Sequence, residues 1–169
     1  MSTNGVIIPG YPTTTARGLV LVFDGLTLSI TQFGSFPSQY PRLDASYTGI
    51  STTLRGNTSR QGTQFRPKSL WTFDAYLTLE QHATWARMEA SFLDAPGPFT
   101  LHDYTKPFAE NGTRTRGLAP NSTVDSTGGK DVYYASFNAE PVRAVQMVET
   151  NATGDLFSFQ FQETEATAA

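Results

Sequence analysis

Residues 69–93 read SLWTFDAYLTLEQHATWARMEASFL, and the apolar pattern of this stretch changes its period part-way along. In the first nine residues apolar and polar side chains alternate, which is typical of a half-buried strand. From Thr78 onward the apolar residues recur at helical spacing instead. The stretch therefore predicts a strand that leads directly into an amphipathic helix, and no other part of the chain has so clear a helical pattern.

The two ends of this helix are marked by capping and terminating residues. Thr78 followed three residues later by Gln81 predicts a capping box, in which each side chain bonds to the backbone N–H of the other residue. Pro96 ends the helix, because proline disfavours helix at the preceding residue and has no N–H of its own. We expect the helix over about residues 78–93.

One face of the predicted helix is apolar. Trp85, Met88 and Phe92 lie at positions i, i+3 and i+7, which predicts that they anchor the helix to an apolar surface. A helix with a single apolar stripe needs a sheet to cover. The same stripe is expected to be widened by Ala86, Ala90 and Leu93.

Strand patterns occur on both sides of this stretch. Residues 19–30, LVLVFDGLTLSI, have two apolar runs around Asp24-Gly25, which is a preferred pair for a two-residue type I′ turn. Residues 155–163, DLFSFQFQE, alternate phenylalanine with polar residues. We predict seven or eight strands in an α+β chain that is mainly antiparallel β. The expected architecture is a β-sandwich or a partly open barrel with one flanking helix.

The length of 169 residues fits one β-rich domain, which we place over residues 18–163. Residues 1–17 contain two prolines and a threonine run, and are expected to form an extended arm. Residues 164–169 are expected to be a frayed tail. Long polar loops are expected at about 34–69 and 109–130, the first with short strands allowed for near 45–54 and 64–65.

Composition and charge exclude several classes of protein. With 12 basic and 15 acidic residues the chain lacks the basic footprint of a nucleic-acid-binding protein. It has no cysteine, so neither a disulfide nor a thiolate metal site is expected. The first residues lack the basic and apolar regions of a signal peptide, and the longest apolar run is far too short to span a membrane. We expect a protein made in the cytoplasm, with neither a membrane nor a specific nucleic-acid sequence as its partner.

Charge is unevenly distributed along the chain. Between residues 40 and 70 there are five basic residues and one acidic residue, whereas the C-terminal part is acidic. The basic segment is interpreted either as a solvated loop or as a surface that meets an acidic partner. Opposite charges on opposite edges would allow copies of the chain to pair in a ring-closing contact. The candidate contact residues between copies are Arg42, Arg55, Arg60, Arg66, Lys68, Glu149, Asp155, Glu163 and Glu165.

No catalytic or cofactor-binding motif occurs in the sequence. His82 and His102 have carboxylates near them but no second histidine at metal-binding spacing, so we interpret both as structural. The nucleophile elbow and the phosphate-binding loops are also missing. We predict no enzymatic activity, no cofactor and no metal. An enzyme would have to use carboxylates such as Asp74, Asp103, Glu140 and Glu149. A carbohydrate-binding module would have to use aromatic residues such as Trp71, Tyr133, Tyr134 and Phe137, which we otherwise expect in the core.

Three stretches together resemble a known group of proteins. They are TFDAYLTLEQHATWARMEASFL at 72–93, GPFTLHDYTKP at 97–107 and LFSFQFQETE at 156–165. In this order they resemble the minor tail proteins of long-tailed bacteriophages, namely the lambda-type tail tip protein M and, more loosely, the distal tail protein family. The likeness covers about residues 45–163. The N-terminal arm and hairpin and the long 109–130 segment are additions to the pattern of the short tail-tip proteins.

The resemblance implies a tail-tube-like fold and a structural role in the virion. It implies a ring, commonly of six subunits, at the distal end of the tail tube or at the junction with the baseplate. The partners it implies are other copies of the same chain, the tail tube protein and a hub or tip protein. The alternative function is a β-sandwich that binds carbohydrate, as a receptor-binding or decoration module.

Overall fold

The structure is a computed structural model that describes residues 18–35, 40–44, 49–52, 58–61, 68–111, 114–151 and 154–165. These residues form one helix and fifteen strands. The helix is α1 (Leu79–Asp94). The strands of the main sheet are β1 (Leu19–Phe23), β2 (Leu26–Ile30), β3 (Phe33–Ser35), β4 (Arg42–Asp44), β7 (Ser69–Leu77), β8 (Phe99–Asp103), β10 (Gly117–Leu118), β13 (Ala135–Pro141), β14 (Gln146–Asn151) and β15 (Gly154–Glu165). Two smaller sheets are formed by β9 (Phe108–Asn111), β11 (Asp125–Thr127) and β12 (Lys130–Tyr133), and by β5 (Gly49–Thr52) and β6 (Thr58–Gln61).

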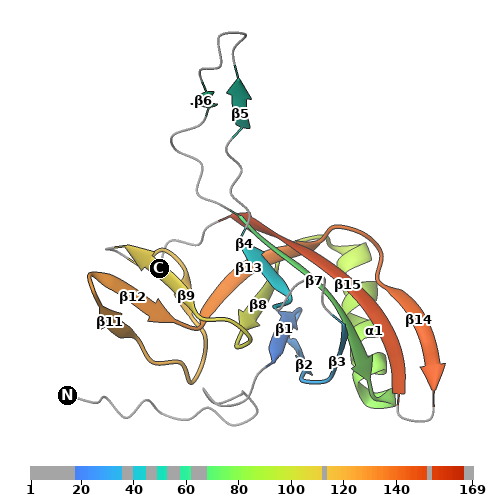
Figure 1. Cartoon of the computed structure of the whole chain (residues 1–169). Helices are drawn as coiled ribbons and strands as arrows, with labels where there is room; N and C mark the ends of the chain where they lie inside the picture. Colours follow the sequence, from blue (N-terminus) through green and yellow to red (C-terminus); the bar gives the residue numbers. More distant parts are fainter. Residues whose placement is uncertain are drawn as a thin grey trace.

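The main sheet is antiparallel and curls around one side of α1 (Figure 1). Its strand order is β2-β1-β8-β13-β15-β7-β3, and β10, β14 and β4 pair with β13, β15 and β7 respectively. The helix packs on β2, β7 and β15, and so covers the concave face. The predicted class is confirmed: the chain is α+β and mainly antiparallel β, and the sheet forms a half-barrel with one flanking helix.

The stretch that predicted the fold forms the elements expected of it. Along β7 every second side chain is buried, among them Trp71, Phe73 and Leu77. Thr78 is the N-cap of α1, and both hydrogen bonds of the capping box with Gln81 are present. Gln81 also donates from Nε2 to the backbone oxygen of Ser29 at 2.8 Å, which ties the first turn of the helix to β2.

The buried stripe of α1 is narrower than the sequence predicts. Trp85 and Met88 are buried, and Phe92 packs on the core while partly exposed. The prediction that three further residues widen the stripe is wrong, because at about 100° per residue they lie on the side of the helix that faces solvent. These exposed residues are Ala86, Ala90 and Leu93.

The concave face is filled mainly by aromatic rings. Phe73 stacks on Phe159 of the neighbouring strand with centroids 5.2 Å apart. The Trp85 ring meets Phe159 edge-on at 5.2 Å and lies 6.0 Å from Phe99. These contacts hold the helix against β15 and β8. They follow from the alternation of phenylalanine and polar residues along β15, as expected from the sequence.

Two tight turns use backbone conformations that glycine favours. Between β1 and β2, Asp24 and Gly25 have φ of 49° and 73°, and a type I′ turn requires positive φ at both positions. Between β11 and β12, Gly128 and Gly129 have φ of 64° and 74°. The first strand and the turn of this second hairpin lie within residues 109–130, where a long polar loop was expected.

The two expected loops contain short strands. The described parts of 34–69 include β4, β5 and β6, and β5 lies within the 45–54 region where a short strand was allowed for. The short strand allowed for near residues 64–65 falls outside the described residues. Segment 109–130 contains β10, β11 and most of β9. The strand number is therefore about twice the predicted one, because these strands are too short to show a period of their own.

Candidate functional site at an open strand edge

The β14–β15 hairpin carries an open strand edge of the main sheet. β15 pairs with β14 on one side and β7 on the other, so its backbone is covered. Among the described strands β14 pairs with β15 alone, which leaves its second edge open. An open edge presents backbone N–H and C=O groups on which another strand can pair.

Large apolar side chains are exposed along this edge. Met147 and Val148 on β14 are 55% and 58% exposed, and Val142 in the preceding segment is 50% exposed. The register shifts between Met147 and Glu149, which forms an irregularity of the bulge type. Bulges and charged residues at an edge limit indiscriminate pairing. The edge therefore combines apolar surface with features that favour a specific partner over general aggregation.

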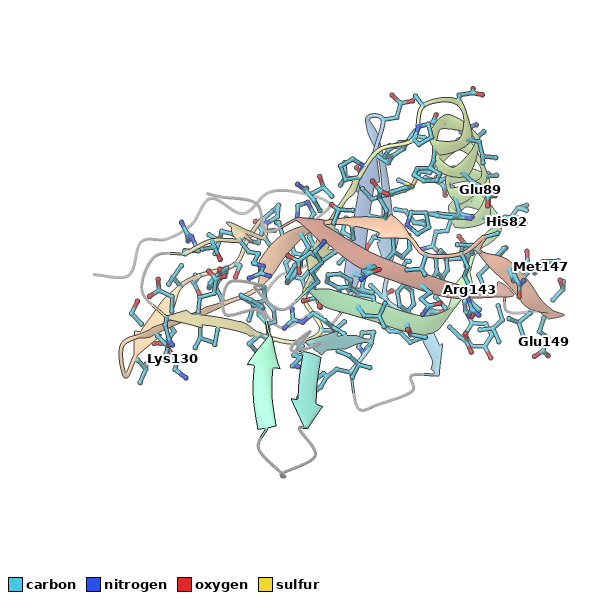
Figure 2. All side chains as sticks on the ribbon, turned by 90° about the horizontal axis from the view of Figure 1, so that it is seen from above. His82, Glu89, Lys130, Arg143, Met147 and Glu149 are labelled. Atoms are coloured by element: carbon cyan, nitrogen blue, oxygen red, sulfur yellow. The ribbon has the colours of Figure 1, made fainter. Side chains whose placement is uncertain are left out.

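The hairpin is tied to the helix by a histidine. His82 Nδ1 lies 3.1 Å from a carboxylate oxygen of Asp155, and its ring lies 4.7 Å from that of Phe157. Figure 2 shows His82 at the same end of the molecule as Met147 and Glu149, while Lys130 lies at the opposite end. His82 thus links the helix to β15.

Away from this edge, charged groups form two buried clusters. In the first, Arg42 Nη1 lies 3.2 Å from Asp103, and both side chains are fully buried. Asp103 also accepts a hydrogen bond from Trp71 Nε1 at 3.0 Å and two from Thr105. The Arg42 guanidinium lies over the ring of Phe108 at 5.3 Å. The charge of Arg42 is therefore compensated inside the chain.

The second cluster joins the small β9–β11–β12 sheet to the main sheet. Arg116 binds Glu163 of β15 through Nε at 2.9 Å and Glu110 of β9 through Nη1 at 3.0 Å. Glu163 also accepts from the backbone N–H of Ser69 at 2.9 Å, and Glu110 accepts from the Tyr133 hydroxyl at 3.0 Å. One guanidinium thus holds carboxylates from two different sheets.

These contacts shift the pKa values of the groups involved. Burial alone would raise the pKa of Glu110, but hydrogen bonds from Thr115, Arg116 and Tyr133 outweigh it and lower the pKa. Burial raises the pKa of Tyr133, and the Glu110 carboxylate adds to this effect. Burial would lower the pKa of Arg116, but its two carboxylate partners raise it. The cluster is therefore ionised at Glu110 and Arg116 and neutral at Tyr133 near pH 7.

His102 is buried and neutral. It is 8% exposed, and its Nδ1 lies 2.6 Å from the hydroxyl of Ser136. Burial lowers the pKa of His102 to about 4. The adjacent Asp103 is engaged by Arg42 and Trp71.

Two of the carboxylates considered for catalysis, Asp74 and Glu140, lie far apart. On β15, Ser158 is paired with Asp74 and Gln162 with Glu140, and four residues separate these two positions, about 13 Å along the strand. Asp103 is fully buried. Within the described ranges no group of three His, Cys, Asp or Glu side chains is placed to hold a metal ion.

The structure divides the candidate contact residues into three groups. Arg42 and Glu163 are each 1% exposed and paired inside the chain, which removes them from any contact surface between copies. Lys68 and Asp155 are half-buried and Glu149 is exposed, so these three remain candidates. Arg55 and Arg66 lie outside the described residues, as do the side chains of Arg60 and Glu165.

The alternation of inward and outward side chains along the strands would have predicted that Asp103 and Glu163 are buried. Phe99, Leu101 and Asp103 share one face of β8, and Glu163 continues the face of Phe159 and Phe161 on β15. Alternation therefore places both carboxylates inward, where they require cationic partners. Arg116 gives no such signal, because it precedes β10 in an irregular segment.

Of the aromatic residues considered for ligand stacking, three lie in the interior. Trp71, Tyr133 and Phe137 are at most 2% exposed. Tyr134 is half-buried and packs beside Tyr104 with ring centroids 6.0 Å apart. The four rings do not form an exposed platform.

No protein-family model, curated protein or solved structure matches this chain. In the part of the chain that the structure describes, no helix is long and apolar enough to cross a membrane.

Proposed function

We propose that this chain is a structural subunit of a bacteriophage tail. In this proposal it assembles into a ring, expected to contain six copies, at the distal end of the tail tube, and stacks on the tube protein and on a hub or tip protein. The observation that carries the proposal is the open edge of β14 with Met147 and Val148 exposed on it. A ring subunit needs a surface of this kind to meet the next copy.

The position of β5 and β6 supports a head-to-tail contact. This pair of strands stands apart from the main sheet, on a different side of the molecule from β14 (Figure 1). β6 carries Arg60, and Arg55 and Arg66 lie near it in sequence, whereas β14 carries Glu149. Two unlike surfaces with opposite charge favour heterologous contacts, which generate rings when the rotation closes.

The test is the assembly state of the full chain at micromolar concentration and in the presence of tail tubes. We expect rings in electron micrographs, either of the chain alone or at the ends of the tubes. Replacing Met147 and Val148 by glutamate should abolish the rings and leave the melting temperature unchanged, because both side chains are exposed. Leu118→Glu, at an exposed position on β10, which pairs with β13 and not with β14, serves as the control and should still assemble. A parent chain that neither self-assembles nor binds tube ends would contradict the proposal.

A further inference from the structure

His102 points to the convex face of the main sheet, opposite α1. Its neighbours along β8, Leu101 and Asp103, face the concave side, where Leu101 is part of the main core and Asp103 binds Trp71. Because side chains alternate along a strand, His102 faces the other way. It is 8% exposed, and its Nδ1 lies 2.6 Å from the Ser136 hydroxyl. It is therefore a buried titratable group outside the main core.

A short segment, residues 117–122, crosses the convex face next to His102. β10, at the start of this segment, pairs with Ser136 of β13, and Ser136 in turn pairs with His102. On the other side of β8, His102 pairs with Val20 of β1, and Val20 lies in a buried cluster with Ala119. The segment therefore runs from β13 towards β1 at the level of His102, and we call it the flap.

The contacts that hold the flap on the sheet include a strand of two residues and hydrogen bonds from irregular backbone. The Ala119 N–H donates to the backbone oxygen of Tyr134 at 2.8 Å, and the Tyr104 hydroxyl donates to that of Pro120 at 2.6 Å. The Ser122 hydroxyl accepts from the Tyr134 N–H at 2.9 Å. Irregular segments at the margin of a sheet open at lower free energy than the core strands.

Burial disfavours the charged form of His102 and lowers its pKa to about 4. The other titratable side chains that β8, β13 and the residue before β13 place on this face are Tyr104, Glu140 and Tyr134. Glu140 is four residues from Ser136, about 13 Å along the strand. β1 and the flap carry no charged residue. A protonated His102 therefore gains hydration if the flap above it moves away.

We propose that residues 117–122 are an acid-sensitive flap that opens when His102 takes up a proton. Opening lets water reach the imidazolium and uncovers Val20 and Tyr104 on the convex face. Near pH 7 His102 is neutral and the flap stays closed. The flap acts within one chain, so it does not depend on assembly into rings.

Hydrogen exchange of the full chain tests the flap. Protection factors at pH 7 and at about pH 4.5 are compared for the amides of Ala119 and Ser122, which donate to Tyr134 and to Ala119 respectively. With a pKa of 6.5 in the open state and about 4 in the closed state, we expect these factors to fall on the order of 50-fold. At both pH values they should also be at least roughly tenfold lower than those of β7 and β15, because the flap opens while the sheet stays folded.

Two histidine variants identify the group that drives opening. His102→Gln keeps a polar side chain without the titration and should lose most of the fall in protection. His82→Gln removes the other histidine of the chain, and as the matched control it should keep the fall. An equal fall in the parent and in His102→Gln would overturn the inference, as would flap protection factors equal to those of β7 and β15.

A measurement on the parent chain decides the question if His102→Gln does not fold. The imidazole resonances of His102, assigned by comparison with His82→Gln, are followed by NMR as the pH is lowered. We expect them to titrate over the same pH range in which the Ala119 and Ser122 amides lose protection. A His102 that titrates while these amides stay protected would overturn the inference.

Discussion

At the scale of single residues, the buried carboxylate of Asp103 is paired with a cation and with neutral hydrogen-bond donors. Asp103 receives hydrogen bonds from Arg42, Trp71 and Thr105, so the carboxylate oxygens are satisfied. Burying an ion pair costs desolvation energy, which is offset only when such partners are in place. These contacts join β4, β7 and β8 through one carboxylate.

Met88 tests the burial of the helix stripe. Its side chain is fully buried against the sheet. Met88→Asp should lower the free energy of unfolding by about 3 kcal/mol or more, because it places an unpaired charge in the core. Urea unfolding measures the effect, with the exposed Ala86→Asp as the control. A Met88→Asp chain as stable as its parent would mean that the stripe is not buried in the monomer.

His102 should make stability depend on pH. In the unfolded chain it titrates near pH 6.5, whereas burial lowers its pKa to about 4 in the folded chain. Between these values the unfolded state binds a proton that the folded state does not, so stability falls as pH is lowered from 6.5 to 4. The total loss is on the order of 3 kcal/mol.

The measurement compares the free energy of unfolding with pH in the natural chain and in His102→Gln. Acidic groups affect both chains alike, so the difference between the two curves isolates the histidine. We expect the free energy of unfolding of the natural chain, relative to that of His102→Gln, to fall as the pH is lowered from 6.5 to 4. Parallel curves would show that His102 is solvated in the folded protein.

At the scale of elements, the helix is stabilised at its N-terminus and by its contacts with the sheet. Thr78→Ala removes the capping hydrogen bond to the N–H of Gln81 and should cost about 1 kcal/mol of stability. Thr123→Ala, at an exposed loop position, is the control and should change stability by much less. Equal stabilities of the two variants in thermal unfolding would argue against the capping box.

The sequence is most informative for elements that are long enough to show a period. β7, α1 and β15 were predicted from their alternation, their spacing and a cap. β3, β4, β10 and β11 were not predicted, because strands of two or three residues form where a longer strand offers them a partner. β4, for example, pairs with the first residues of β7 and shows no pattern of its own.

The candidate site was predictable only in part. The exposed edge of β14 depends on which strands pair, and pairing between strands far apart in sequence does not follow from periodicity. The burial of Glu163 does follow from it, since this residue continues the inward face of β15. The partner Arg116 lies 47 residues earlier and could be found only from the structure.

At the scale of the whole molecule, the second buried cluster couples two sheets. Glu163→Gln leaves Arg116 with Glu110 as its remaining carboxylate partner and should destabilise the protein by about 3 kcal/mol. Hydrogen exchange should then speed up in β9 and β12 more than in β7. The exposed Glu149→Gln is the control. Uniform acceleration over all strands would show that the cluster supports the fold in general and not the junction between the sheets.

The place of β15 in the main sheet has a consequence for synthesis of the chain. It is the last of the described strands in sequence, yet it lies between β13 and β7 and beside β14. On the ribosome the other described strands emerge first, and until β15 follows, the edges of β7 and β13 with which it pairs have no partner strand. Completion of the main sheet must therefore wait until β15 has been made. Chains that stall earlier present apolar strands to chaperones and proteases.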